Sequence, residues 1–212
     1  MMTKTWNGGV EMIRCVVFDV GNVLADFRYR DYMRDLGFPE ETVEFLARNM
    51  VETDYWAELD LGRHTIADAV ETFTGRYPAL AGEIRAFWEN IRHIVAEYDY
   101  AQPLIHRLKE KGYGVYLLSN YPVETAEMHW PTFRFLPETD GRIISGYEKL
   151  AKPDPAIYRL LESRFGLDLG TCVFIDDNPA NVKAARAVGM EAVRFTGLPA
   201  LEEALKDLGV TL

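Results

Sequence analysis

The sequence predicts an α/β fold in which a parallel sheet is covered by helices and a block of helices is inserted near its start. From residue 99 to residue 212, short apolar runs alternate with amphipathic helical segments, which is typical of a parallel sheet buried on both faces. Between residues 29 and 97 the pattern is helical and shows no convincing strand. Polar side chains follow directly after three of the apolar runs. Because open α/β sheets bind ligands at the carboxyl ends of their strands, the functional site is expected there.

The expected strands are short apolar runs. The first covers residues 13–18 and stops before Gly21 and Asn22. Four later strands are predicted at residues 115–118, 141–145, 172–175 and 192–195. Helices are predicted at residues 101–111, 155–165, 179–188 and 201–208, and a glycine follows each of the first three, as is typical of a helix end.

The inserted helical block is expected to form a cap. Helices are predicted there at residues 42–50, 66–73 and 80–95, and Thr65 with Asp68 suits the start of the second. Because the block follows the first strand, it would lie over the carboxyl edge of the sheet. The predicted division is a disordered leader at residues 1–11, a core of residues 12–27 and 99–212, and a cap of residues 28–98.

Composition argues against several classes of protein. The 212 residues are 48% hydrophobic, enough for a sizeable core, and the net charge of −10 disfavours nucleic acid as a partner. No apolar stretch approaches the length of a membrane span, and the N-terminus lacks the apolar stretch of a signal peptide. Cys15 and Cys172 lie in apolar runs and are interpreted as reduced core thiols. A cytoplasmic protein without membrane contacts is expected, as a monomer or homodimer.

Four dispersed polar elements support the functional prediction. Each alone has an ordinary structural explanation as a turn, loop or helix-capping element. Their order and their placement at strand ends are much harder to explain in that way. The elements are Asp19 after the first strand, Ser119-Asn120 after a middle strand, Lys152 before a Pro-Asp-Pro run, and Asp176-Asp177 after a later strand.

These side chains suit the transfer of a phosphoryl group. A carboxylate such as Asp19 can attack phosphorus and form an aspartyl-phosphate, which divides one difficult step into two. Because two anions repel each other, the attack needs cations, and Mg²⁺ held by carboxylates together with the Lys152 ammonium would supply them. A hydroxyl and an amide at a strand end, Ser119 and Asn120, would hold the remaining phosphoryl oxygens.

In these elements the sequence resembles the haloacid dehalogenase (HAD) superfamily of hydrolases, over residues 12–212. The resemblance implies a Rossmann-like α/β core with a C1-type helical cap. Within the superfamily the chain is most similar to bacterial alpha-glucose-1-phosphate phosphatase-like enzymes. That similarity implies a magnesium-dependent phosphatase of a small phosphorylated metabolite, with a sugar phosphate favoured. The matching motifs, in order, are Asp19-Val20-Gly21-Asn22-Val23, Leu118-Ser119-Asn120, Lys152-Pro153-Asp154-Pro155 and Ile175-Asp176-Asp177-Asn178-Pro179.

The resemblance also implies a role for each matching residue. Asp19 would be the nucleophile and a Mg²⁺ ligand. The Gly21 carbonyl and Asp177 would also bind the metal, and Asp176 would contribute nearby or through water. Lys152 would neutralise the phosphoryl charge and act with Asp19 and Ser119 in catalysis. The phosphoryl group would be bound by Ser119, Asn120, Asn22 and Lys152.

Gly21 departs from the pattern, because most phosphatases of the superfamily carry a second aspartate at that position. That aspartate protonates the leaving group and then activates water, help that is typically worth about 10²–10⁴ in rate. Three explanations stay open. Another group replaces the missing acid, with Asp26 the first candidate; or the substrate has a good leaving group such as an anomeric or acyl phosphate; or the protein is slow or only binds phosphorylated ligands.

Two alternative functions follow from the same residues. A metal-independent dehalogenase would share the fold and the nucleophile but would have no use for the acidic pair Asp176-Asp177, so the phosphatase is favoured. A weakly or non-catalytic protein that binds phosphorylated ligands is the alternative that Gly21 supports. In the cap, Arg63 and Trp56 are candidate substrate contacts, although Trp56 also suits packing between cap helices.

Overall fold

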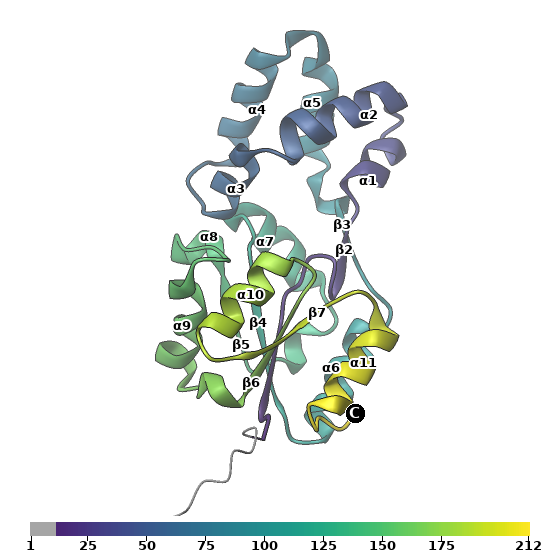
Figure 1. Ribbon diagram of the computed structural model, residues 1–212. Coiled ribbons are helices and arrows are strands. Elements are labelled where there is room, and N and C mark those ends of the chain that lie inside the picture. The colour runs from purple at the N-terminus through teal and green to yellow at the C-terminus, as the bar shows by residue number, and fades with distance from the viewer. Residues whose placement is uncertain (1–11) are drawn as a thin grey trace, which may run out of the picture.

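The computed structural model describes residues 12–212, so the predicted leader at residues 1–11 lies outside the described residues. The core is one parallel sheet of five strands: β1 (Cys15–Phe18), β4 (Gly114–Ser119), β5 (Gly141–Ile144), β6 (Cys172–Asp176) and β7 (Glu191–Arg194). Their order across the sheet is β5-β4-β1-β6-β7 (Figure 1). This arrangement confirms the predicted Rossmann-like α/β fold.

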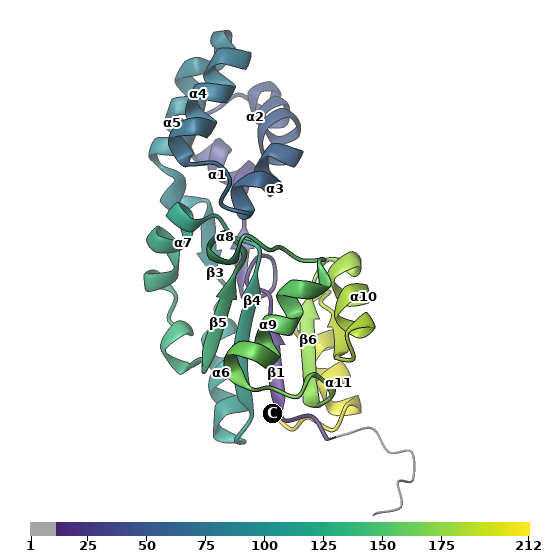
Figure 2. The same cartoon turned by 90° about the vertical axis from the view of Figure 1, so that its left-hand side faces the viewer.

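Helices cover both faces of the sheet. Successive residues of a strand point to opposite faces, and the strands carry apolar side chains on both. On β1, Val16 and Phe18 belong to the apolar core on one face, and Val17 belongs to the core on the other. The three side chains are fully buried, so packing on both sides fixes the strand that leads to Asp19. One face is covered by α6 (Ala101–Glu110) and α11 (Leu198–Asp207), and the other by α9 (Pro155–Phe165) and α10 (Pro179–Ala187) (Figure 2).

A separate unit of helices lies over the carboxyl edge of the sheet (Figure 1). It has its own apolar core, in which Tyr32, Phe73 and Phe87 are fully buried. Thr65 begins a helix as predicted: its hydroxyl accepts from the Asp68 N–H, and the Asp68 carboxylate accepts from the Thr65 N–H at 2.8 Å. The unit comprises α1 (Tyr29–Asp35), α2 (Glu40–Leu46), the π-helical turn Ala47–Val51, α3 (Asp54–Asp60), α4 (Ile66–Arg76) and α5 (Ala81–Glu89).

Two short antiparallel strands, β2 (Ala25–Phe27) and β3 (Val95–Glu97), connect the helical unit to the core. The expectation of no strand between residues 29 and 97 is therefore wrong, and so is a helix that reaches residue 95. Instead α5 ends at Glu89, a 3₁₀ turn follows at Ile91–His93, and the chain then becomes extended. Strands this short leave no periodic signal in the sequence, because pairing with a distant segment forms them.

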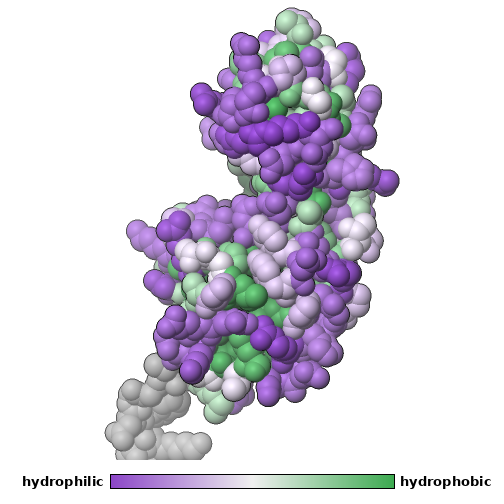
Figure 3. Space-filling view, turned by 90° about the vertical axis from the view of Figure 1, so that its right-hand side faces the viewer, coloured by the Kyte–Doolittle hydropathy of each residue, from purple (hydrophilic) through white to green (hydrophobic). Residues whose placement is uncertain are grey.

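Two short helices, α7 (Val123–His129) and α8 (Ser145–Glu148), follow β4 and β5 and lie beneath the helical unit. Figure 3 shows a narrow waist between the helical unit and the core, and a mostly hydrophilic surface over the helical unit. Among the helices of residues 12–212, none has the length and apolar character needed to cross a bilayer.

Candidate active site

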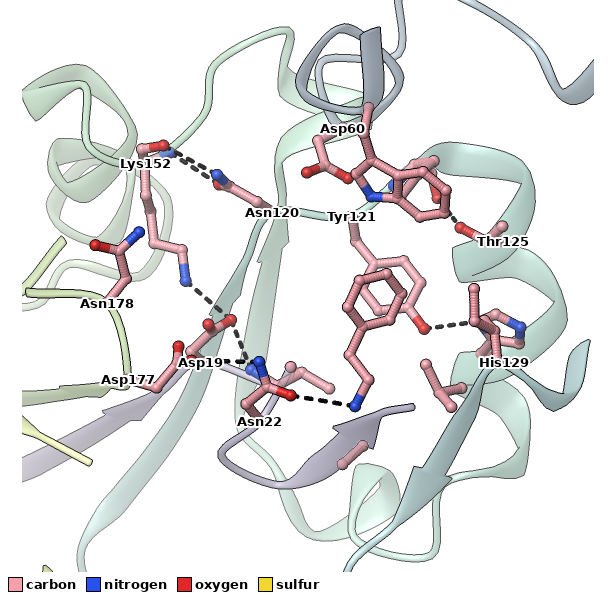
Figure 4. Close-up of a pocket in the computed structure, with 18 of the residues that line it drawn as sticks. Asp19, Asn22, Asp60, Asn120, Tyr121, Thr125, His129, Lys152, Asp177 and Asn178 are labelled. Atoms are coloured by element: carbon pink, nitrogen blue, oxygen red, sulfur yellow. Dashed lines mark hydrogen bonds and ion pairs between the residues drawn. The ribbon is translucent and has the colours of Figure 1, made fainter. Parts of the chain in front are cut away.

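A cavity of about 310 Å³ lies between the carboxyl edge of the sheet and the helical unit (Figure 4). Three adjacent strands end beside it: Asp19 follows β1, Ser119 ends β4 and Asp176 ends β6. Because β1 pairs in parallel with both neighbours, the carboxyl ends of these strands meet at one edge. Lys152 joins them from the loop before α9. The structure therefore brings together the polar elements that are dispersed in the sequence.

Lys152 links two carboxylates at the centre of the site. Its Nζ lies 2.9 Å from Asp19 Oδ1 and 2.7 Å from Asp176 Oδ2, and all three side chains are buried. Burial alone would lower the pKa of Lys152, but the two carboxylates outweigh it and raise that pKa. The ammonium is therefore a fixed positive charge beside Asp19.

Asp19 lies where its charged form is disfavoured. Burial raises its pKa to about 7 against the opposing charge of Lys152, and the charge of Asp176 adds to the increase. Its Oδ1 accepts from the Val20 N–H at 2.7 Å and contacts Lys152. Within residues 12–212, no hydrogen bond reaches Oδ2. One oxygen is thus held in place while the other is available to react.

Asp19, Asp176 and Asp177 form an acidic triad with ligand atoms within 4.8 Å of one another. Both oxygens of Asp176 are already used: Oδ1 accepts from the Asn178 N–H at 2.8 Å, and Oδ2 accepts from Lys152. Asn181 Nδ2 lies 3.1 Å and 3.0 Å from these two oxygens. Asp177 instead lines the cavity together with Asp19. Mg²⁺ prefers oxygen ligands such as carboxylates, so the acidic triad fits this ion. Asp19 and Asp177, which line the cavity, are the two that could bind it directly.

Gly21 and Asn22 form the loop that follows Asp19. Asn22 adopts a left-handed backbone with φ 56°. Its Nδ2 donates to Asp177 Oδ2 at 3.2 Å, and its Oδ1 accepts from the Phe27 N–H at 3.3 Å. The predicted phosphate ligand Asn22 lines the cavity, and its amide also links the loop to Asp177 and to β2. Gly21, whose carbonyl is the predicted metal contact, lines the cavity.

Ser119 and Asn120, which end β4 and begin the next loop, differ in their hydrogen bonds. The Ser119 hydroxyl is buried and has no hydrogen-bond partner among the described residues. An unsatisfied buried hydroxyl is costly, but Ser119 is not among the residues that line the cavity. Asn120 lines the cavity, but its Nδ2 donates to the Lys152 carbonyl at 2.9 Å and its Oδ1 accepts from the Lys152 N–H at 2.8 Å. The Asn120 amide therefore positions Lys152.

Comparison with known proteins decides the family. The family model described as haloacid dehalogenase-like hydrolase matches residues 13–189. The chain is a haloacid dehalogenase-like hydrolase. Flavin mononucleotide hydrolase 1 of Arabidopsis thaliana is 28% identical to it over 202 residues, which are 93% of this chain and 78% of that protein. Sesquiterpene phosphatase astK of Aspergillus oryzae is 24% identical over 191 residues, 86% of this chain and 90% of that protein.

Solved structures share the fold of this HAD-like hydrolase. The HAD family enzyme BT-2542 of Bacteroides thetaiotaomicron has a TM-score of 0.67 at 24% identity and covers 87% of this chain and 94% of its own. L-2-haloacid dehalogenase of Xanthobacter autotrophicus has a TM-score of 0.64 at 19% identity and covers 95% of this chain and 85% of its own. The superfamily that the four motifs predicted is confirmed.

The helical unit of the HAD-like hydrolase places some expected residues in the cavity and leaves others out. Trp56 lines the cavity and stacks on Trp88 with ring centroids 5.7 Å apart. Arg63 is absent from the lining; it is 56% exposed and pairs with Glu58 at 2.8 Å. Asp26 is also absent, because its neighbours on β2 face the cavity and strand residues alternate in direction.

Asp60, at the end of α3, is a cavity residue that the sequence does not predict. It enters the cavity from the side opposite Asp19 (Figure 4). Tyr121 and His129 line the same side, with Tyr121 Oη 2.6 Å from His129 Nδ1. An acid at the end of a helix before Leu61-Gly62 gives no local signal of a site, because only the placement of the helical unit brings it there.

Proposed function

We propose that this HAD-like hydrolase is a magnesium-dependent phosphatase that cleaves a small phosphate monoester through an aspartyl-phosphate on Asp19. The observation that carries the proposal is the placement of Lys152 and Asp177 beside Asp19, which supplies one fixed cation and a second carboxylate for a metal. Relatives named as phosphatases support it. So does the structural relative BT-2542, which has been solved with magnesium and inorganic phosphate.

The residues of the site then have distinct tasks. The free oxygen of Asp19 attacks phosphorus, and the bond from phosphorus to the leaving oxygen breaks. Lys152, held by Asn120, spreads the charge of the transferring group, and the Ser119 hydroxyl binds one of its oxygens. Mg²⁺ bound by Asp19, Asp177 and the Gly21 carbonyl would neutralise phosphoryl charge. Water then attacks phosphorus, which releases phosphate and restores the Asp19 carboxylate.

The cavity wall beyond the acidic triad would contact the leaving group and so limit which substrates fit. It is formed by apolar and aromatic side chains, including Phe27, Trp56, Ile91 and Ile94. The predicted sugar phosphate remains a candidate, because aromatic rings can pack on the C–H face of a sugar. A flat ring system or a hydrocarbon chain suits the same wall. The relatives named for flavin mononucleotide and for a sesquiterpene make both worth testing.

Phosphate release with and without Mg²⁺ tests the proposal. The substrates are sugar phosphates, flavin mononucleotide, an isoprenyl monophosphate and an acyl phosphate. At least one ester is expected to turn over, and exhaustive chelation is expected to lower its rate by about 10²-fold or more. Full activity after chelation would contradict the metal requirement and would revive the metal-independent dehalogenase, which a haloacid substrate would then reveal.

The variant Asp177→Asn tests separately whether Asp177 binds the metal. The substitution removes a direct ligand while preserving shape, so the Mg²⁺ concentration for half-maximal rate is expected to rise by about 10–100-fold or more. Asp207→Asn, on the exposed end of α11, is the matched control and should leave the metal dependence unchanged. An unchanged metal dependence in both variants would remove Asp177 from the site.

A further inference from the structure

Asp60 is a carboxylic acid in the cavity that the proposed roles leave unused. It is the last residue of α3, and Figure 4 shows its carboxyl group entering the cavity from the helical unit, across from Asp19 and Lys152. Within residues 12–212, no hydrogen bond or ion pair reaches its side-chain oxygens. A carboxyl group without a cationic partner at a reaction site is free to exchange a proton with a substrate.

Contacts across the waist fix where Asp60 lies. The Ser145 hydroxyl donates to the Asp60 carbonyl. Lys149 Nζ donates to the Gly62 carbonyl at 2.5 Å, and the Ile66 N–H donates to a Glu124 carboxylate oxygen at 2.6 Å. The segment that follows α3 is therefore held by α8 and α7 of the core. These contacts place the carboxyl group over the sheet edge in a defined position rather than on a loose cap.

The surroundings of Asp60 favour its protonated form. Burial raises its pKa to about 8, and the charge of Asp19 adds to the increase while Lys152 opposes it. Trp56 and Tyr121 supply apolar surface on the same side of the cavity. At neutral pH a large fraction of the protein would therefore carry a proton on this group, ready for donation.

The neighbouring Tyr121 and His129 do not offer a proton to the cavity. Burial lowers the pKa of His129, so the ring is neutral. Its Nε2–H donates to the Ile91 carbonyl at 3.1 Å, which leaves Nδ1 to accept from the Tyr121 hydroxyl at 2.6 Å. Burial also raises the pKa of Tyr121 strongly. Both protons are committed to hydrogen bonds, and Asp60 is the acid that remains on this side.

Gly21 also lines the cavity, and a Cβ atom there would meet no atom within 4 Å. Its backbone has no left-handed φ that would require glycine. The place where most superfamily phosphatases carry an acid is therefore open space, and Asp60 enters the same cavity from above. A general acid in this chain can act from the helical unit instead of from the loop after β1.

We propose that Asp60 is the general acid–base of this hydrolase, an inference that rests on the proposed phosphatase function. As the bond from phosphorus to the leaving oxygen breaks, Asp60 gives its proton to that oxygen and becomes a carboxylate. When water attacks the aspartyl-phosphate, the proton of the water goes to Asp60, and the bond from phosphorus to Asp19 breaks. Phosphate is released, and both aspartates return to their starting forms.

The leaving-group dependence of Asp60→Asn tests this role. General acid help matters most for a poor leaving group, so kcat/KM for alkyl phosphates is expected to fall by about 10²–10⁴-fold, and for p-nitrophenyl phosphate by less than about 10-fold. Asp54→Asn, at the exposed start of the same helix, should leave both rates unchanged. Equal losses for all esters, or a leaving-group effect in Asp26→Asn and not in Asp60→Asn, would overturn the assignment.

Thermal unfolding tests the protonation of Asp60 even without a known substrate. Its pKa is raised from 3.8 to about 8 in the folded protein, so wild-type stability should fall as pH rises through this window. Asparagine does not titrate, while Asp19, Lys152, Tyr121 and His129 are common to both proteins. The Tm of Asp60→Asn minus that of wild type should therefore grow by several degrees between about pH 5 and about pH 9. A Tm difference independent of pH would contradict a protonated Asp60, whatever the outcome of the activity screen.

Discussion

Asp19→Asn is expected to lower phosphate release by about 10³-fold or more while the protein stays folded. The amide has nearly the same shape, and its oxygen can still accept the hydrogen bond that the Val20 N–H now donates to Asp19. It is a much weaker nucleophile, and Lys152 keeps Asp176 as its partner. The measurement is the rate of phosphate release from the best ester of the panel, beside the Tm of both proteins. Asp207→Asn should match wild type in both, and retention of full activity by Asp19→Asn would remove it as nucleophile.

Lys152→Met is expected to destabilise the fold by about 3–5 kcal/mol, because it leaves buried carboxylates without their cation. The Lys152 side chain is 1% exposed and that of Asp176 is 0% exposed, so water cannot replace the lost charge. Methionine fills much of the same volume, so lost packing contributes little. The free energy of unfolding from denaturant titration measures the effect, and phosphate release should fall with it.

A surface pair provides the control for this substitution. Lys109 pairs with Asp140 at 2.6 Å, with side chains 31% and 35% exposed, so Lys109→Met should cost no more than about 1 kcal/mol. If the two variants lose similar amounts of stability, the buried pair at the centre of the site is not the strong electrostatic contact that the geometry indicates.

The acidic edge of the site was predictable from sequence because its residues lie at ends of strands. Asp19, Ser119 and Asp176 each follow or end an apolar run that packing on both faces makes visible in the sequence. A parallel sheet then brings those ends together without further information. The hydrogen bonds of Asn22 and Asn120 were not predictable in this way. Each amide bonds a partner in another loop, and sequence alone does not say which loops meet.

It was harder to predict which side chains on the helical side of the cavity reach it, because long-range contacts decide where they lie. Asp60 reaches the cavity only because α7 and α8 hold the segment after α3. Asp26, the predicted substitute acid, is absent from the cavity lining, because its neighbours on β2 face the cavity. Arg63, a predicted substrate contact, instead pairs locally with Glu58. A loop position in a cap therefore says little about whether its side chain meets the substrate.

Mass spectrometry of the protein after one turnover tests most directly whether Asp19 is the nucleophile. The protein is mixed with Mg²⁺ and an ester that the panel identifies as a substrate. The reaction is quenched in acid on the timescale of a single turnover, and the protein is digested. If Asp19 is the nucleophile, a fraction of the peptide that contains it should be heavier by one phosphoryl group. Fragmentation should place that group on Asp19, and the peptide of Asp19→Asn should carry none. Phosphate release without any phosphorylated protein across the time course, or a phosphoryl group on another residue, would contradict this mechanism.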